Sequence, residues 1–186
     1  MAPPDRLADL SEINAALWRE LGRAPLDRHH EWRSPVLATV AGDRADARTV
    51  VLRETDADAR ELRLFTDARA GKVQQIAQHP HGTLAMWSRR LKWQLRVQVL
   101  LTVQSEGLGV ASRWAKLKNS PAAQDYLNPL PPGSVLDTTA PGREVPERGH
   151  FAIVVCSVVA IDWLELHAEG HRRAAFDAAG GRWLVP

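Results

Sequence analysis

The sequence predicts a mainly β protein, in which an antiparallel sheet closes into a barrel with flanking helices. Short β-prone segments follow one another closely, separated by turn signals such as Gly42-Asp43. The regular strand–helix spacing of a doubly wound fold is missing, and so is a glycine-rich dinucleotide loop. Neither an internal repeat nor a domain boundary is evident, so we expect a single domain over residues 1–186.

The composition is that of a globular protein with a sizeable core. Hydrophobic residues make up 45% and charged residues 25%, and the net charge of +2 argues against a nucleic-acid surface. The first ten residues lack the apolar segment of a signal peptide, and the longest apolar run, 151–161, is too short for a membrane span. Cys156 is the only cysteine, which excludes an internal disulfide. We therefore expect a cytoplasmic protein without a membrane or nucleic-acid partner.

Hydrophobic spacing assigns the elements in order. An amphipathic pattern predicts a helix over residues 5–21, with Asp5 as its cap and Gly22 as its stop. Strands are predicted at 36–41, 47–54, 61–66, 82–87, 91–104, 151–161 and 163–167, with a closing hairpin over 172–176 and 182–185. Short helices are predicted at 72–78 and 111–117. Residues 119–147 are rich in Pro and Gly and form a connector, which is typical of a functional or disordered loop.

Residues 47–72 carry the strongest functional signal. Two predicted strands deliver Arg48, Arg53 and Thr66, and Lys72 follows in the first turn of a short helix. A lysine in that turn opposes the helix dipole, so a bound anion explains it better than helix stability does. The alternative is a half-buried strand with solvated arginines at its tips. The pattern favours a site for a phosphate-bearing ligand.

Motifs in this region and beyond it resemble those of the pyridoxamine 5'-phosphate oxidase family. They are Arg48-Thr49-Val50-Val51-Leu52-Arg53, Phe65-Thr66-Asp67, Lys72 with Gln75-Ile76 and Pro80, Trp87, Gln94-Leu95-Arg96-Val97, Ile161-Asp162-Trp163 and His171-Arg172-Arg173-Ala174-Ala175-Phe176. The resemblance covers most of the chain from Ser34 onward, apart from the connector 119–147. It implies an FMN-binding split β-barrel of antiparallel Greek-key type, and a homodimer with two FMN sites at the subunit interface.

The resemblance also implies roles for individual residues. Arg48 and Lys72 would hold the FMN phosphate, with Thr66 nearby, and Arg53 and Phe65 belong to the same motifs. The backbone of Thr49, Val50, Val51 and Leu52 would lie along the isoalloxazine ring. The other subunit would contribute Gln94, while Trp163 and Arg173 would complete the pocket and His171 would face the substrate. No residue is identified as catalytic, and no metal is expected.

Three positions depart from the family pattern. Arg53 replaces a lysine, Gly71 replaces an arginine before the phosphate-binding lysine, and Glu169 replaces a substrate-contacting arginine. A carboxylate at position 169 would repel a substrate phosphate, so the chain resembles a variant subgroup that acts on another small molecule. We expect a flavin-dependent oxidoreductase. The alternatives are a non-catalytic flavin or haem binder of the same fold, and a barrel without a cofactor.

Overall fold

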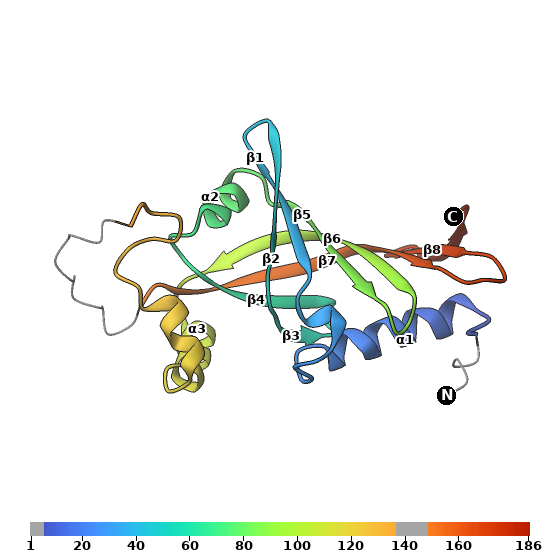
Figure 1. The fold of residues 1–186 in the computed structure, drawn as a ribbon, viewed down its shortest axis with the longest axis horizontal. Helices are drawn as coiled ribbons and strands as arrows, with labels where there is room; N and C mark the ends of the chain where they lie inside the picture. Colours follow the sequence, from blue (N-terminus) through green and yellow to red (C-terminus); the bar gives the residue numbers. More distant parts are fainter. Residues whose placement is uncertain (1–5, 137–148) are drawn as a thin grey trace.

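A computed structural model describes residues 6–136 and 149–186, whose strands form one nine-stranded sheet (Figure 1). The strand order is β2-β1-β5-β6-β7-β4-β3, with β8 paired to β7 and β9 paired to β8. All of these pairings are antiparallel, so the predicted mainly β class is confirmed. The strands are β1 (Val36–Ala41), β2 (Arg44–Thr49), β3 (Leu52–Asp56), β4 (Glu61–Asp67), β5 (His81–Ser88), β6 (Trp93–Gln104), β7 (Phe151–Glu165), β8 (Arg172–Asp177) and β9 (Gly180–Leu184).

The two longest strands, β6 and β7, pair with each other in the interior of the sheet. The prediction of two strands at 151–161 and 163–167 was wrong, because β7 runs unbroken to Glu165. Asp162 does not interrupt the ladder, since it pairs with Arg96 of β6. The start of β7 pairs with β4 and its end pairs with β8. One strand therefore connects the two ends of the molecule.

The predicted strand 47–54 is two strands. β2 ends at Thr49, which pairs with β1, and β3 begins at Leu52, which pairs with β4. The chain crosses between opposite edges of the sheet at Val50 and Val51, where the Val50 N–H donates to the carbonyl of Pro35 at 2.9 Å. The sequence hides this crossing because neither glycine nor proline marks it.

Helix α1 (Leu10–Arg23) begins and ends later than the predicted helix 5–21. Its cap is Asp9, which accepts hydrogen bonds from the backbone N–H groups of Ser11 and Glu12. The predicted cap, Asp5, lies outside the described residues. Gly22 does not stop the helix, which continues through it for one residue. The buried face of α1 is formed by Ile13, Ala16, Leu17, Glu20 and Leu21.

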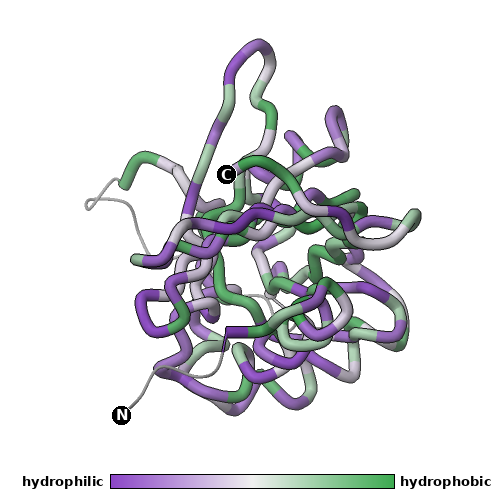
Figure 2. Tube along the Cα trace, turned by 90° about the vertical axis from the view of Figure 1, so that its right-hand side faces the viewer, coloured by the Kyte–Doolittle hydropathy of each residue, from purple (hydrophilic) through white to green (hydrophobic). Residues whose placement is uncertain are grey.

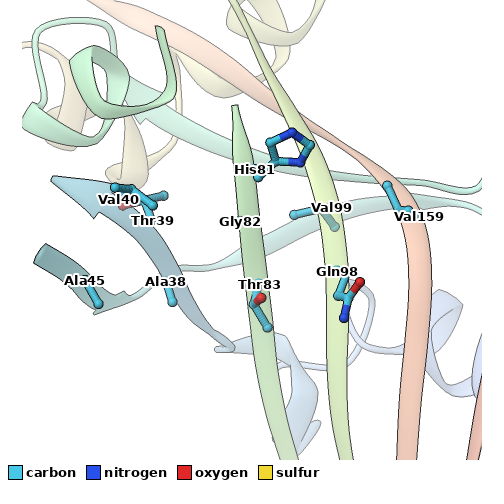
Figure 3. A pocket seen from close by; sticks show the side chains of 10 residues that line it. All are labelled: Ala38, Thr39, Val40, Ala45, His81, Gly82, Thr83, Gln98, Val99 and Val159. Carbon is cyan, nitrogen blue, oxygen red and sulfur yellow. The ribbon is translucent and has the colours of Figure 1, made fainter. Parts of the chain in front are cut away.

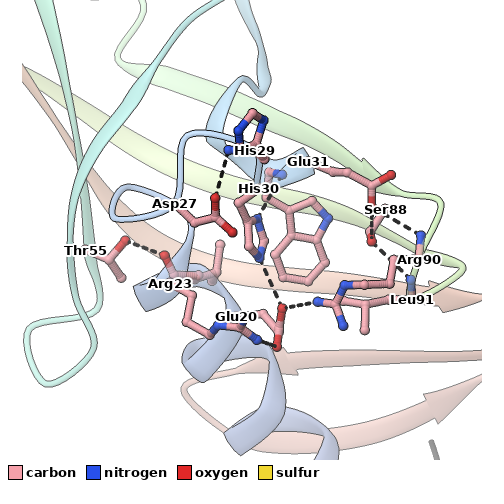
Figure 4. Close-up of polar contacts among 12 residues, drawn as sticks. Glu20, Arg23, Asp27, His29, His30, Glu31, Thr55, Ser88, Arg90 and Leu91 are labelled. Atoms are coloured by element: carbon pink, nitrogen blue, oxygen red, sulfur yellow. Dashed lines mark hydrogen bonds and ion pairs between the residues drawn. The ribbon is translucent and has the colours of Figure 1, made fainter. Parts of the chain in front are cut away.

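A buried carboxylate ties α1 to the turn between β5 and β6 (Figure 4). Glu20 accepts hydrogen bonds from Arg90 Nη2 at 2.6 Å, Arg23 Nη1 at 2.9 Å and His30 Nε2 at 3.1 Å. His30 belongs to the segment just before the short helix η1 (Glu31–Arg33). Burial raises the pKa of Glu20, but the hydrogen bond from His30 and the charges of Arg90 and Arg23 hold it below its usual value. The charge of Glu20 is therefore compensated locally.

The described residues bury their apolar side chains in two clusters. The larger one packs α1 against the sheet and contains Trp32, Trp93 and Trp163. The smaller one lies between α3 (Leu108–Leu117), η2 (Pro121–Tyr126) and the start of β7. The tip of the β1–β2 hairpin, which projects from the sheet, is hydrophilic (Figure 2). No helix within residues 6–136 and 149–186 is long and apolar enough to cross a bilayer.

The predicted connector 119–147 is only partly described. Its first residues form η2, from which Tyr126 packs edge-to-face on Phe151 at 5.2 Å between ring centroids. Residues 137–148 lie outside the described part of the chain. The predicted helix 72–78 is observed as α2 (Gly71–Gln78), and the predicted helix 111–117 begins earlier, at Leu108.

Candidate functional site

Lys72 and Thr66 meet where β4 gives way to α2. The chain leaves β4 after Asp67 and enters α2 at Gly71, with Ala70 as a cap residue that makes no side-chain hydrogen bond. The first turn of α2 contains Lys72 and no acidic residue. Lys72 Nζ donates to Thr66 Oγ1 at 3.1 Å, and Thr66 is 4% exposed. The start of α2 and the lysine together place positive charge at this end of the helix, which suits an anion.

Burial lowers the pKa of Lys72, and the nearby charge of Arg48 lowers it further. The carboxylate of Asp67 acts in the opposite direction but does not cancel these effects. No carboxylate of the described residues lies within ion-pair distance of Lys72 Nζ. A bound dianion would therefore relieve an unfavourable charge at this position.

Arg48 reaches the same place from β2. Its Nη1 donates to Thr39 Oγ1 at 2.5 Å, and its Nη2 donates to Gln75 Oε1 at 2.9 Å and to Asp46. Gln75 lies three residues after Lys72 on α2, so it joins the strand hairpin to the helix. From the sequence alone, no role in the site was predicted for Thr39, Gln75 or Asp46. The spacing of two between Asp46 and Arg48 on one strand was a usable signal for the last of these.

The crossing segment carries the residues expected along the flavin ring. Thr49 is exposed, whereas Val50 and Val51 are half-buried. The side chain of Leu52 is fully buried in the larger core cluster, so only its backbone is available to a ligand. These positions keep their expected place beside Arg48, since they continue the chain directly from β2.

Arg53 and Phe65 face the smaller core cluster. The guanidinium of Arg53 lies over the ring of Phe65, 5.8 Å from its centroid. Phe65 in turn packs edge-to-face on Phe151, with 5.0 Å between ring centroids. Arg53 Nε is buried and has no hydrogen-bond partner among the described residues. These two side chains therefore lie beside the aromatic cluster, on β3 and β4.

The remaining predicted residues lie at the far end of β7. Gln94 pairs with Leu164, and Arg173 pairs with the same residue from the other side. Arg173 Nη2 binds Asp162 at 2.7 Å, and Arg96 binds the same carboxylate. Trp163 is fully buried and packs on Trp93 with 5.6 Å between ring centroids, so it faces the larger core cluster. His171 is exposed, and its Nδ1 accepts from the backbone N–H of His167 at 3.2 Å.

The structure therefore divides the predicted site into two separate groups. Asp67, at the end of β4 near Lys72, pairs with Phe151, whereas Arg173 pairs with Leu164. At a rise of about 3.3 Å per residue, these positions on β7 are on the order of 40 Å apart along the strand. Within a single chain, the two groups therefore lie at opposite ends of β7. We call them the near end (Arg48, Thr66 and Lys72) and the far end (Gln94, Trp163, Arg173 and His171).

Between these two ends, one face of the sheet exposes several large apolar side chains among polar ones such as Arg96 and Gln98. Large hydrophobic side chains are exposed on β1, β5, β6 and β7, and Val159 is 52% exposed at a bulge where β7 has one residue more than β6. A hollow of about 400 Å³ opens here between β1 and β7, with His81, Thr83 and Gln98 among its lining residues (Figure 3). A second hollow of about 420 Å³ on β5 and β6 includes Trp87, Gln94 and Arg96. Exposed apolar patches of this kind are typical of interfaces. The exposed large residues are Val36, Val40, Trp87, Leu100 and Val159.

The sequence of this part of the chain matches a known family. The model of the FMN-binding domain of pyridoxamine 5'-phosphate oxidase matches residues 15–105, a range that includes the near end and Gln94. Residues 15–105 are therefore similar to the FMN-binding domain of the pyridoxamine 5'-phosphate oxidase family. A pyridoxine/pyridoxamine 5'-phosphate oxidase from Caulobacter vibrioides is 26% identical over 196 residues, which cover 98% of this chain and 86% of that protein.

Solved structures confirm the split-barrel fold of this family. A pyridoxamine 5'-phosphate oxidase-related, FMN-binding protein from Nostoc punctiforme has a TM-score of 0.73 and 23% identity, covering 97% of this chain and all of that one. PhzG from Burkholderia lata, solved with tetrahydrophenazine-1-carboxylic acid, has a TM-score of 0.75 and 16% identity over the whole of both chains. A heme-binding protein from Mycobacterium smegmatis has a TM-score of 0.52 and 17% identity, covering 86% of this chain and 57% of that one.

The three departures from the family pattern lie in different surroundings. Gly71 is exposed, and a Cβ at this position would meet no atom within 4 Å, so the missing arginine is not explained by lack of space. Glu169 is exposed in the turn between β7 and β8, where its N–H donates to His167 Nδ1 at 3.2 Å. Arg53 is held by the aromatic cluster. The near end thus relies on Lys72 and Arg48 as its cations.

Proposed function

We propose that this protein binds FMN in two symmetric clefts between the subunits of a homodimer, and acts as a flavin-dependent oxidoreductase on a small molecule in the cytoplasm. The observation that carries the proposal is Lys72, a partly buried cation at an uncapped helix start with a hydroxyl, Thr66, as its partner. A phosphate dianion fits this arrangement, because it balances the charge of Lys72 and can accept hydrogen bonds at the start of α2.

In this proposal the near end holds the phosphate through Lys72, Thr66 and the remaining donor of Arg48. The crossing segment Thr49–Leu52 leads away from Arg48 and would run along the flavin ring with its backbone. The flavin supplies hydride chemistry when bound, while the protein orients it. The contacts of Lys72, Thr66 and Arg48 support the phosphate site. The oxidoreductase reaction is proposed from the similarity to the family.

The homodimer is supported by the separation of the near and far ends. Gln94 and Arg173 lie on the order of 40 Å along β7 from the near end, so they can join it only across an interface. The exposed apolar face on β1, β5, β6 and β7 supplies a surface for such an interface. A two-fold axis would place the far end of each chain on the near end of its partner, which creates two equal sites.

The substrate is expected to differ from pyridoxamine 5'-phosphate. The exposed carboxylate of Glu169 lies two residues before His171, where the family pattern has an arginine. A negative charge at this position disfavours a phosphorylated substrate. We therefore expect a small-molecule substrate that places no phosphate near the turn between β7 and β8.

The first experiment is the visible absorption spectrum of the purified protein, followed by titration with FMN. We expect bound FMN, whose reduction by NAD(P)H or an amine and reoxidation by oxygen would separate an enzyme from a passive flavin binder. A haem spectrum would support the haem-binding alternative. Colourless protein that takes up no added FMN would contradict the proposal.

A second experiment tests whether each site is shared between two chains. Lys72→Ala removes a near-end residue and Arg173→Ala a far-end residue. If the sites are shared, dimers that contain one chain of each variant have one intact site and one doubly altered site. Random mixing then restores tight FMN binding at about a quarter of all sites. No restoration after proven subunit exchange would show that Lys72 and Arg173 belong to one chain's site or to no common site.

A further inference from the structure

The guanidinium of Arg48 is already engaged by the protein. Nη1 donates to Thr39 Oγ1 at 2.5 Å and to the carbonyl of Leu37 at 3.3 Å. Nη2 donates to Gln75 Oε1 at 2.9 Å and to a carboxylate oxygen of Asp46. Each of these nitrogens carries two N–H groups, so both are fully used. Only Nε–H is left for a ligand, and Arg48 cannot bind a phosphate through both Nη groups unless Asp46 or another acceptor gives way.

Asp46 is a fixed part of this arrangement. Besides Arg48, it accepts a hydrogen bond from Gln75 Nε2 at 2.7 Å, and it lies opposite Thr39 in the β1–β2 pairing. The hydrogen bond from Gln75 has the largest effect and lowers the pKa of Asp46. Burial raises this pKa by less, and the charge of Arg48 and its hydrogen bond lower it further, so that it lies below its usual value. The side chain therefore stays ionised at neutral pH.

The carboxylate changes the charge that a ligand meets at the near end. Lys72 and Arg48 supply two positive charges. Asp46 supplies one negative charge, and its carboxylate forms an ion pair with the guanidinium of Arg48. A phosphate dianion must approach that guanidinium beside Asp46. The negative charges of the phosphate and of Asp46 would then repel each other. The guanidinium of Arg48 does not depend on Asp46 alone, because it also donates to Thr39, to Gln75 and to the carbonyl of Leu37.

We propose that Asp46 is a specificity-determining residue of the near end, a resident carboxylate that weakens the binding of phosphate-bearing ligands relative to uncharged ones. The inference rests on the proposed function, because it takes the near end as the FMN phosphate site. Beyond the proposed function, it predicts that Asp46 reduces the preference of this protein for FMN over riboflavin, which lacks the phosphate.

The test is the ratio of FMN to riboflavin affinity in the full-length protein, measured by fluorescence titration at low ionic strength. Asp46→Asn removes the charge, keeps the shape and leaves an amide oxygen for Arg48. We expect FMN to bind on the order of tenfold more tightly, from the loss of one repulsion in a water-like dielectric. Riboflavin affinity is expected to change less than twofold. Asp43→Asn is the matched control, since Asp43 lies on the same hairpin and its carboxylate pairs with Arg44 at 3.6 Å, its one ion-pair partner among the described residues.

Weaker FMN binding in Asp46→Asn would overturn the inference, because it would mean that Asp46 orients Arg48 for the phosphate. An unchanged FMN-to-riboflavin ratio, or the same change in Asp43→Asn, would overturn it as well. These outcomes differ from failure of the proposed function, in which wild-type protein binds no FMN. If thermal melting shows that Asp46→Asn is unfolded, Asp46→Ser serves as the second neutral variant and the same ratio decides.

Discussion

Lys72 at the near end and Arg173 at the far end have different charged neighbours. At the near end, Lys72 Nζ contacts the hydroxyl of Thr66, and the described residues place no carboxylate within ion-pair distance of it. At the far end, Arg96 and Arg173 share the carboxylate of Asp162. Burial raises the pKa of Asp162, but hydrogen bonds from Arg173 and Arg96 hold it below its usual value. An anion should therefore bind more favourably beside Lys72, whose charge is not balanced by a carboxylate, than beside Arg173.

The largest effect is expected from Lys72→Ala. Loss of a charge-assisted bond to the phosphate should weaken FMN binding by about 1–3 kcal/mol, roughly five- to 150-fold. Riboflavin affinity should change little, since it carries no phosphate. Fluorescence titration with both ligands measures the difference. Lys118→Ala, at an exposed lysine after α3, is the control. Equal losses for FMN and riboflavin would show that Lys72 does not contact the phosphate.

The same lysine predicts proton uptake when FMN binds at alkaline pH. Its pKa in the free protein lies below the usual 10.5, because burial and Arg48 disfavour the charged form. A bound dianion favours the charged form and raises the pKa again. Between these two values FMN binding therefore takes up a fraction of a proton, and FMN affinity falls as pH rises through the lowered pKa.

Calorimetry in buffers of different ionisation enthalpy measures this uptake. It should be absent at neutral pH, where Lys72 is already charged, and absent at all pH values in Lys72→Ala. Uptake of the same size in the variant would assign the proton to another group and would remove the main difference between the two ends.

The near end was largely predictable from the sequence because its residues are local. Arg48, Thr66 and Lys72 all lie within residues 48–72, on β2, on β4 and on the helix α2 that follows β4. Strand alternation and the helix dipole were enough to indicate an anion there. The roles of Thr39 and Gln75 were missed, since both depend on how β1 and α2 lie against Arg48, which spacing alone does not give.

The far end was less predictable for a physical reason. Gln94, Trp163 and Arg173 come together through the register of β6, β7 and β8, and that register depends on long-range pairing. The predicted strands were divided at Asp162, since an acidic residue inside an apolar run is typical of a strand end. In the structure, Arg96 and Arg173 form ion pairs with Asp162, so the strand continues through it. The crossing at Val50 and Val51 was missed for a similar reason, since both residues favour strands.

A smaller effect is expected from Arg173→Ala at the far end. Asp162 already satisfies this arginine, so a ligand gains less from it, and FMN affinity should fall by about 1 kcal/mol, roughly fivefold. Arg96→Ala is a matched control, because Arg96 binds the same carboxylate but is not among the expected FMN contacts. The two variants are compared by FMN titration. A loss in Arg173→Ala as large as that in Lys72→Ala would remove the contrast between the ends.

The smallest effect concerns Arg69, which ties the connector to the near end. Its Nη2 binds Asp67 Oδ2 at 2.7 Å and the carbonyl of Asn128 at 2.7 Å, and its Nη1 binds the carbonyl of Pro129 at 3.1 Å. A lysine keeps the charge but cannot reproduce this fork. Arg69→Lys should therefore lower the free energy of unfolding by about 0.5–1.5 kcal/mol in urea, and speed proteolytic cleavage near residues 128–130.

FMN affinity should change less than twofold in Arg69→Lys, because the side chain is committed to Asp67 and the connector carbonyls. Arg44→Lys, at an exposed arginine on the β1–β2 hairpin, is the control for the substitution itself. Unchanged stability and proteolysis would mean that the connector does not depend on this contact. A loss of FMN affinity close to that of Lys72→Ala would instead place Arg69 among the phosphate ligands. The near end would then have three cations, and Gly71 would no longer leave it short of an arginine.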